Sequence, residues 1–254
     1  MNPTRDLAVV IMAAGKGTRM KDPNRAKVMY ELDGQPLIHF VADLAYDLKA
    51  SRVIIVVGYM RNTVETYVRE SHPEAEFAVQ EQQLGTGHAV LQAKPLLKDF
   101  EGEVLVLSGD VPLLQRSTID ALRKTHHQQK AVATILTAEL DDPTGYGRII
   151  RNSDKSVKKI VEHRDAGPGE LGVREINSGI YLFDNAALFD GLEHLQPHNV
   201  QKEYYLTDVF EYFWNHHWTV AALMASHPDE IRGVNTVEQL SEAWAVLGER
   251  KRQS

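Results

Sequence analysis

The first segment that could do chemistry follows an uncharged apolar run at residues 7–12 and joins small residues to positive charge. The small residues are Ala13, Ala14, Gly15 and Gly17, and the cations are Arg19 and Lys27. Small residues let the backbone approach a ligand closely, and the backbone N–H groups of such a turn bind anions. Arginine and lysine strengthen the attraction for phosphate. This pattern predicts a triphosphate held at the end of a central strand.

The spacing of this segment differs from two common phosphate loops. It lacks the Gly-x4-Gly-Lys-Ser/Thr pattern, and Met20 stands where a dinucleotide fingerprint has its third glycine. Two glycines alone are a weak signal, so a strand-to-helix turn that binds nothing is the alternative at this point.

Asp110 ends a second segment, Ser108-Gly109-Asp110, which follows an apolar run at residues 104–107. In open α/β sheets, ligands bind outside the carboxyl ends of the strands. A carboxylate there, beside a phosphate site, is well placed to hold Mg²⁺, which prefers oxygen ligands. An ordinary turn that begins at Asp110 is equally compatible with the residues alone.

Two further loops carry polar groups suited to a base and a sugar. The loop at residues 80–88 holds Gln80 and Gln83, whose amides both donate and accept hydrogen bonds as a nucleobase edge does. A helix-entry loop capped by Thr86 would look the same. The turn at residues 141–148 precedes Glu162 and Asn177, which could bind sugar hydroxyls, although turns are generally rich in such residues.

The elements that must position these side chains alternate between strand and helix. Strands are predicted at residues 7–12, 53–57, 77–80, 104–107 and 131–138, and helices at 36–49, 61–70, from about 87, and at 117–127. Such alternation is typical of a parallel sheet covered by helices. After residue 141 we expect strands at 148–151, 157–161, 176–183 and 220–224, a loop at 167–169 and a terminal helix at 238–250.

Composition restricts the class of protein. The chain has 254 residues, 43% of them hydrophobic and 25% charged, which is typical of a globular protein. The net charge of −7 disfavours general nucleic-acid binding, and the lack of cysteine excludes disulfides and thiolate chemistry. The N-terminus lacks the apolar core of a signal peptide and no run approaches a membrane span, so we expect a cytoplasmic protein.

In this order, the segments resemble the uridylyltransferase domain of the bifunctional bacterial enzyme that makes UDP-N-acetylglucosamine. The resemblance covers nearly the whole chain and is most specific in Gln-Leu-Gly-Thr-Gly-His-Ala at residues 83–89 and Asp-Asp-Pro-Thr-Gly-Tyr-Gly-Arg-Ile at residues 141–149. The other matching segments are residues 13–20, 27–28, 80–82, 109–112, 160–163, 175–179, 203–208 and 233–235.

The resemblance implies an α/β, Rossmann-like nucleotidyltransferase fold, with a mostly parallel mixed sheet covered by helices on both faces. It implies one domain over residues 1–254, with a nucleotide-binding half at 1–140, a sugar-binding half at 141–235 and a C-terminal helix at 236–254. The family's second half, a left-handed β-helix that transfers acetyl groups, has no counterpart in this sequence. We therefore expect no acetyltransferase activity, whether the chain is a cut or a naturally short form.

The resemblance also implies residue roles. The nucleotide-binding residues would be Met12, Ala13, Ala14, Gly15, Lys27, Gln80, Gln83, Gly85, Thr86, Ser108, Gly109 and Asp110. The sugar-binding residues would be Gly147, Glu162, Asn177, Tyr204, Thr207 and Asn235. Arg19, Lys27 and Asp110 would be catalytic, and Asp110 and Asn235 would hold Mg²⁺. One departure concerns Lys27, because Ala26 replaces the proline that usually precedes this lysine in the family.

The implied reaction converts UTP and N-acetylglucosamine 1-phosphate into UDP-N-acetylglucosamine, a cell-wall precursor, and pyrophosphate. The sugar phosphate would attack the α-phosphorus in line, and the main obstacle is repulsion between anions, which Mg²⁺, Arg19 and Lys27 would offset. Two alternatives are a uridylyltransferase for glucose or galactose 1-phosphate and a non-catalytic nucleotide-sugar sensor. The sequence leaves the oligomeric state open.

Overall fold

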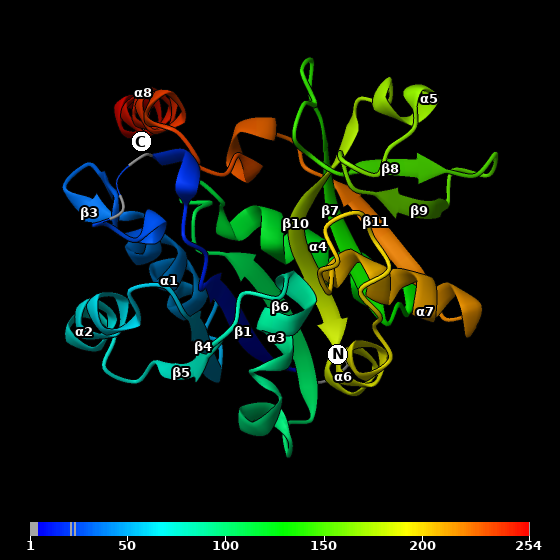
Figure 1. The fold of residues 1–254 in the computed structure, drawn as a ribbon, viewed down its shortest axis with the longest axis horizontal. Coiled ribbons are helices and arrows are strands. Elements are labelled where there is room, and N and C mark those ends of the chain that lie inside the picture. Colours follow the sequence, from blue (N-terminus) through cyan, green and yellow to red (C-terminus); the bar gives the residue numbers. More distant parts are fainter. Residues whose placement is uncertain (1–4, 21, 23, 254) are drawn as a thin grey trace.

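The computed structural model describes residues 5–20, 22 and 24–253 (Figure 1). Within these residues, nine strands form one mixed sheet, and a short hairpin lies apart from it. The sheet strands are β1 (Asp6–Ala13), β4 (Arg52–Val57), β5 (Glu76–Val79), β6 (Gly102–Ser108), β7 (Ala133–Glu139), β8 (Arg148–Arg151), β9 (Val157–Val161), β10 (Glu175–Asp184) and β11 (Val220–Met224). The hairpin joins β2 (Glu31–Leu32) to β3 (Gln35–Pro36).

Helices separate most of the strands along the chain. They are α1 (Leu37–Asp47), α2 (Arg61–Ser71), α3 (Thr86–Leu91), α4 (Arg116–Gln129), α5 (Pro168–Leu171), α6 (Asn185–Glu193), α7 (Val209–Asn215) and α8 (Val237–Gln253). In Figure 1, α8 lies near the hairpin, at the opposite side of the molecule from α7.

The main sheet has the order β11-β7-β10-β6-β1-β4-β5, with β8 paired to β10 and β9 paired to β8. The pairs β1–β4, β1–β6, β4–β5 and β7–β11 are parallel, whereas β10 runs antiparallel to both β6 and β7. The prediction of a mostly parallel mixed sheet is confirmed.

Both faces of the sheet are buried, as the unbroken apolar runs predict. Along β1, Val9 and Ile11 join one core cluster with α1, α2 and α4, whereas Ala8 and Val10 join the opposite cluster with α3, α6 and α7. Side chains of a strand alternate between its faces, so a run without polar residues stabilises helix packing on both sides. The prediction of helices on both faces is also confirmed.

The strand predictions at residues 148–151, 157–161 and 220–224 match the observed bounds. The loop predicted at residues 167–169 is wrong, because Pro168 begins the short helix α5. Proline suits a first helical position, and the Glu170 carboxylate accepts a hydrogen bond from the Gly167 N–H at 2.9 Å. The helices α6 and α7 were not predicted as complete elements.

The carboxyl ends of β1, β4 and β6 meet at one edge of the sheet. In the parallel registers, Met12 pairs with Ser108 and Ala13 pairs with Val57. The Gly109 N–H donates to the Met12 carbonyl at 2.9 Å, which extends the ladder one residue beyond β6. The loops that follow these strands, together with the start of the antiparallel β10, therefore lie at the same edge.

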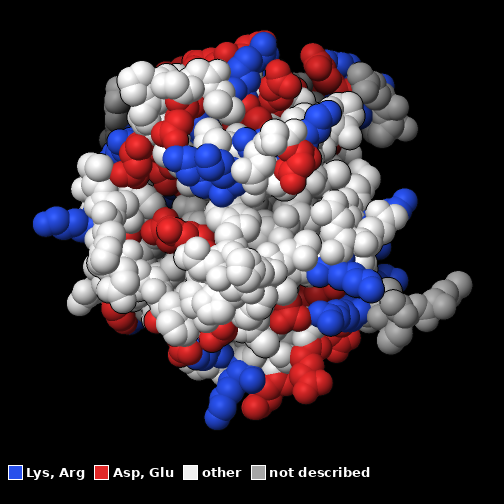
Figure 2. All heavy atoms as spheres, turned by 90° about the vertical axis from the view of Figure 1, so that its right-hand side faces the viewer, with Lys and Arg blue, Asp and Glu red and all other residues white. Residues whose placement is uncertain are grey.

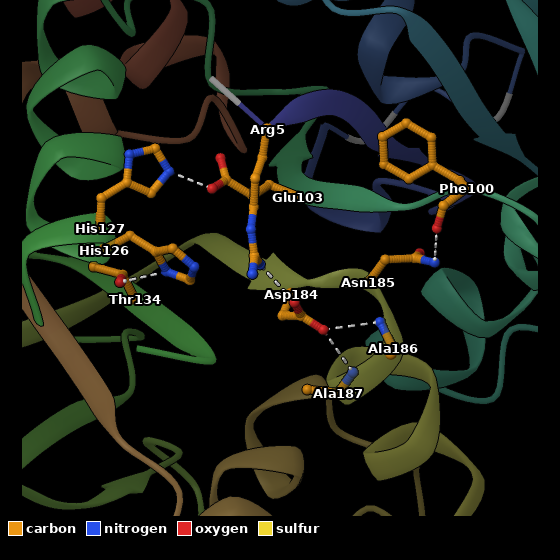
Figure 3. Close-up of polar contacts among 10 residues, drawn as sticks. All are labelled: Arg5, Phe100, Glu103, His126, His127, Thr134, Asp184, Asn185, Ala186 and Ala187. Atoms are coloured by element: carbon orange, nitrogen blue, oxygen red, sulfur yellow. Dashed lines mark hydrogen bonds and ion pairs between the residues drawn. The ribbon is translucent and has the colours of Figure 1, made fainter. Parts of the chain in front are cut away.

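The opposite edge of the sheet carries a separate group of polar contacts (Figure 3). Glu103, at the start of β6, has no exposed side-chain surface and pairs with Arg123 and His127 of α4. His126 contacts the Thr134 hydroxyl at 2.9 Å, and burial lowers the pKa of His126 to about 4. The buried side chains of Glu103 and His126 are thus hydrogen-bonded, as burial requires.

Charged side chains of both signs occur on the face shown in Figure 2, around a largely uncharged centre. None of the helices in the described ranges is long and apolar enough to cross a membrane.

Candidate active site

A cluster of charged and amide side chains lies at the carboxyl edge of the sheet. The Lys27 Nζ is 2.5 Å from Asp110 Oδ2 and donates to Asn235 Oδ1 at 3.0 Å. The Arg19 Nη2 also donates to Asn235 Oδ1, at 2.7 Å. Residues separated by up to 216 positions in the chain therefore form one group.

Close backbone approaches explain how this group is assembled. A Cβ at Gly17, whose φ is +63°, would lie 2.5 Å from the Lys27 Cβ, so the turn carrying Arg19 folds directly against Lys27. The Val234 N–H donates to the Asp110 carbonyl at 2.8 Å and fixes the loop that carries Asn235.

The donor set fits a hard divalent cation. The Asp110 carboxylate and the Asn235 amide oxygen both contact the Lys27 ammonium, which shows that this position attracts positive charge. Only 9% of the Asp110 side chain is exposed, so screening by water is limited. Carboxylate and amide oxygens are suitable ligands for such an ion when substrate phosphates complete its coordination.

A cavity of about 270 Å³ lies beside this cluster. Among its lining residues are the predicted nucleotide-binding residues Met12, Ala13, Ala14, Gly15, Lys27, Gln80, Gln83, Gly85, Thr86, Ser108 and Asp110. Gly109 does not line this cavity. A Cβ at Gly109 would lie 3.1 Å from the Met12 carbonyl oxygen, so the lack of a side chain lets the end of β6 pack closely against β1. The structure thus brings together residues from the ends of three strands.

The two glutamines of this cavity are held from within their own loop. The buried Gln80 donates through Nε2 to the Gly85 carbonyl at 3.0 Å, and Gln83 Nε2 lies 3.4 Å from the Gln80 carbonyl. Gln80 Nε2 also lies 3.1 Å from His88 Nδ1, and burial lowers the pKa of His88. A neutral His88 can accept this hydrogen bond, so the Gln80 amide has a fixed orientation.

A second cavity, of about 200 Å³, adjoins the first and shares Met12, Thr86 and Ser108 with it. Its lining includes the predicted sugar-binding residues Gly147, Glu162, Asn177 and Thr207. The Thr207 hydroxyl donates to Glu162 Oε1 at 3.2 Å, and burial raises the pKa of Glu162. Hydrogen-bonding groups in such a pocket suit a ligand with several hydroxyls.

Three other predicted residues line neither cavity. Asn235 is part of the cluster with Lys27 and Asp110, and Arg19, predicted to be catalytic, contacts Asn235. Tyr204, predicted to bind the sugar, does not line the second cavity. Instead, its backbone accepts from the Gly87 N–H and donates to the Leu84 carbonyl, each at 2.8 Å. Tyr204 therefore supports the loop at residues 80–88.

Several lining residues of the second cavity were not predicted individually. They are Gly145, Tyr146, Ser178, Gly179, Tyr181 and Leu206. Asn177 Nδ2 donates to the Tyr181 hydroxyl at 2.6 Å, and a register shift in β10 separates these two residues. Period-two alternation along β10 could have placed Tyr181 on the face of Asn177, but the sequence does not show the shift.

An α/β sheet with phosphate-binding groups beyond its strand ends defines the Rossmann-like class of nucleotide-binding proteins. Comparison with a family model then identifies the chain, which belongs to the nucleotidyl transferase family over residues 8–249.

Two relatives share the same similarity along this chain. The "Bifunctional protein GlmU" of Pelotomaculum thermopropionicum is 45% identical over 245 residues, which cover 96% of this chain and 53% of the relative. The protein of the same name from Listeria welshimeri is 45% identical over 241 residues, covering 95% and 52%. The chain thus spans about half the length of the curated relatives that it matches.

A solved structure of UDP-glucose pyrophosphorylase with UDP-glucose has the same fold. Its TM-score is 0.78, with 96% of this chain and 99% of that chain covered. Its sequence identity of 19% restricts the comparison to the arrangement of the elements.

Proposed function

We propose that the protein transfers a uridylyl group from UTP to N-acetylglucosamine 1-phosphate, giving UDP-N-acetylglucosamine and pyrophosphate. The observation that carries this proposal is the pair of adjoining cavities beside the Lys27–Asp110–Asn235 cluster. A nucleotide in one cavity and a sugar in the other would bring their phosphates to the shared residues. The similarity to the two GlmU proteins supports the choice of substrates.

We propose that residues 1–140 mainly bind the nucleotide and that residues 141–235 mainly bind the sugar. Met12, Thr86 and Ser108 line both cavities and would lie where the two ligands meet. Glu162, Asn177 and the backbone at Gly147 would hydrogen-bond the sugar. The Gln80 and Gln83 amides would bind the base edge.

The reaction needs no general base, because the attacking sugar phosphate is already an anion. Its obstacle is the repulsion between two phosphate groups, and Lys27 and Arg19 reduce that repulsion by placing positive charge at the cavity edge. We propose that Asp110 and Asn235 hold Mg²⁺, which when bound would supply further positive charge to the phosphates. Lys27 would turn its ammonium from Asp110 and Asn235 towards the phosphates when these residues hold the metal.

The test measures pyrophosphate release from UTP with three sugar phosphates, carrying N-acetylglucosamine, glucose or galactose, with and without Mg²⁺. We expect the highest kcat/KM with N-acetylglucosamine 1-phosphate and no turnover without the metal. The variant Asp110→Asn should lower kcat by about a hundredfold or more, as losses of single electrostatic groups do. Asp120→Asn, an exposed change on α4, is the matched control and should behave as the unchanged protein.

Each other outcome is informative. Near-normal turnover of Asp110→Asn would contradict the metal role. Preference for glucose or galactose 1-phosphate would replace the proposed sugar. Tight binding of a UDP-sugar without turnover, measured by calorimetry, would contradict the enzymatic proposal and favour a sensor.

A further inference from the structure

Two histidines and an aspartate converge between α1 and α2, away from both cavities. His39 and Asp43 are four residues apart on α1 and therefore project from the same side of this helix. His72 follows the last residue of α2 directly. One ligand atom from each of the three side chains lies within 4.8 Å of the others. This spacing resembles a chelating group shared by two helices.

The imidazole Nε2 atoms of both histidines face the Asp43 carboxylate. His72 Nε2 is 2.8 Å from Asp43 Oδ1, and His39 Nε2 is 3.4 Å from Asp43 Oδ2. The exposed fraction falls from 57% for the Asp43 side chain to 23% for His39 and 9% for His72. The cluster is thus open to solvent on the Asp43 side and covered on the His72 side.

The other ring nitrogen of each histidine is held by a hydroxyl. His72 Nδ1 is 2.9 Å from Ser71 Oγ, and the Ser71 hydroxyl donates its single proton to a backbone carbonyl, that of Tyr67 at 3.0 Å. His39 Nδ1 is 3.1 Å from the Tyr67 hydroxyl, which donates to Gln35 Oε1 at 2.8 Å. When the hydroxyl protons point to these oxygens, each hydroxyl can accept from Nδ1–H of its histidine.

This arrangement of hydrogen bonds directs the inner nitrogens towards Asp43. With Nδ1 protonated, a neutral imidazole presents the lone pair of Nε2. Two such lone pairs and the Asp43 carboxylate would then converge as three electron-rich ligands, which one dication would hold together. Outer hydrogen bonds of this kind orient metal-ligating histidines in proteins.

We propose that His39 Nε2, His72 Nε2 and the Asp43 carboxylate bind a divalent transition-metal ion of the zinc type. Zinc takes imidazole and carboxylate ligands at about 2.0–2.2 Å, so its ligand atoms lie roughly 3.4 Å apart in a tetrahedron. The 3.4 Å between His39 Nε2 and Asp43 Oδ2 matches this spacing. The 2.8 Å between His72 Nε2 and Asp43 Oδ1 would widen by roughly 0.6 Å on binding, with water in the fourth position. Mg²⁺ is a poor competitor because it prefers oxygen ligands.

A bound ion would connect α1 to the end of α2, two helices that pack on the same core cluster. The site would stabilise the fold and is independent of the proposed transfer reaction.

The test uses the full chain, freed of metal by a chelator and then returned to buffer with excess Mg²⁺. Zn²⁺ is titrated calorimetrically, and Co²⁺ is added to a second sample to detect absorption typical of four-coordinate nitrogen and oxygen ligation. We expect one Zn²⁺ bound per chain at this site and a melting temperature that rises with Zn²⁺. His39→Gln, Asp43→Asn and His72→Gln should each weaken that binding at least tenfold, since even outer partners contribute this much.

His216→Gln removes an exposed histidine from the adjacent pair His216-His217 and is the matched control, with binding expected to be unchanged. Asp43→Asn is the decisive variant because its exposed side chain leaves the core intact even if the buried His72→Gln unfolds. Zn²⁺ binding that is equal in the unchanged protein and Asp43→Asn would overturn the proposal. The absence of any Zn²⁺-dependent rise in melting temperature would do so as well.

Discussion

Asp208 illustrates, at the scale of single residues, how a carboxylate beside the second cavity affects the stability of the fold. The residue follows Thr207, which lines the second cavity. Burial raises the pKa of Asp208 to about 6, and the negative charges of Glu162 and Glu211 contribute to the same shift. Carboxylates that are brought together out of water disfavour ionisation of one another. At neutral pH, this group therefore opposes folding.

We predict that Asp208→Asn makes the protein more stable at pH 7.5 but not at pH 4. The folded state holds the Asp208 proton up to about pH 6, whereas the unfolded chain releases it near 3.8, the ordinary pKa of an aspartate side chain. The stabilising contribution of the protonated form is therefore present below that value and lost as the pH rises towards 6. Because the side chain is partly solvated, we expect a gain of about 1–2 kcal/mol at pH 7.5.

Urea unfolding of the unchanged protein and of Asp208→Asn from pH 4 to pH 7.5 measures the difference in their free energies of unfolding. Groups that titrate equally in the two proteins do not contribute to this difference. A difference in unfolding free energy that stays constant from pH 4 to pH 7.5 would contradict the assigned pKa. Thr207 and Glu162 remain in place in Asp208→Asn, so the cavity lining itself is not altered.

The sequence alone predicted the positions of some site residues better than those of others. Asp110 was predictable because it follows an apolar strand, and the carboxyl ends of parallel strands meet at one edge. Asn235 follows no strand, and only the family resemblance pointed to it. Tyr204 was assigned to the sugar through its motif, but the motif does not reveal that its backbone, rather than its ring, makes the contacts with residues 84 and 87.

At the scale of elements, the loop between β5 and α3 depends on Gly85. Its φ of +113° lies in a region nearly restricted to glycine, and a Cβ would be 2.5 Å from the Tyr204 carbonyl oxygen. The same loop holds Gln80 and Gln83 beside the nucleotide cavity. A change at Gly85 therefore affects both the stability of the fold and the position of the two amides.

We predict that Gly85→Ala lowers the free energy of unfolding by about 2–4 kcal/mol, from backbone strain plus the close contact. The KM for UTP should rise as well. Gly34→Ala is the matched control, since Gly34 has a φ of +77° but no atom within 4 Å of the added Cβ. That variant should lose only the strain and keep its KM. Equal losses of stability in the two variants would show that Tyr204 does not restrict the loop.

The bounds of strands and helices were predicted best where a run of apolar residues defines the element. The apolar runs of β1, β4 and β6 are bounded to within two residues, because only a doubly buried strand accommodates such a run. The shorter helices depend on local contacts instead. The Asp184 side chain, for example, accepts from the backbone N–H groups of Ala186 and Ala187 and starts α6 where β10 ends. One capping residue is too common in turns to predict a helix.

At the scale of the whole molecule, the two cavities and the buried polar group around Glu103 lie at opposite ends of the strands of the sheet. The two cavities lie at the carboxyl ends of β1 and β6, whereas Glu103 lies near the start of β6, at the other edge (Figure 3). With a net charge of −7 and both signs on the face in Figure 2, the molecule as a whole does not attract phosphates. In the proposed reaction, Lys27 and Arg19 would do so locally.

We predict that Glu103→Ala lowers the free energy of unfolding but leaves kcat and KM unchanged. Removing one member of a buried ion pair typically costs about 3–5 kcal/mol, and we expect about 2–3 kcal/mol here because His127 reaches solvent. Arg123 keeps 18% of its side chain exposed and can rehydrate in part. The rigid strand β6 then keeps Asp110 in position as long as the protein remains folded.

Thermal unfolding by circular dichroism and turnover at about 25 °C test both halves of this prediction on the same samples. Glu101→Gln, an exposed change two residues away, should alter neither quantity. If Glu103→Ala loses turnover while its circular dichroism spectrum still shows the folded state, the two edges are coupled through β6 and the separation is wrong. If its stability is unchanged, the pairs with Arg123 and His127 contribute nothing net, because desolvation of Glu103 already offsets their attraction.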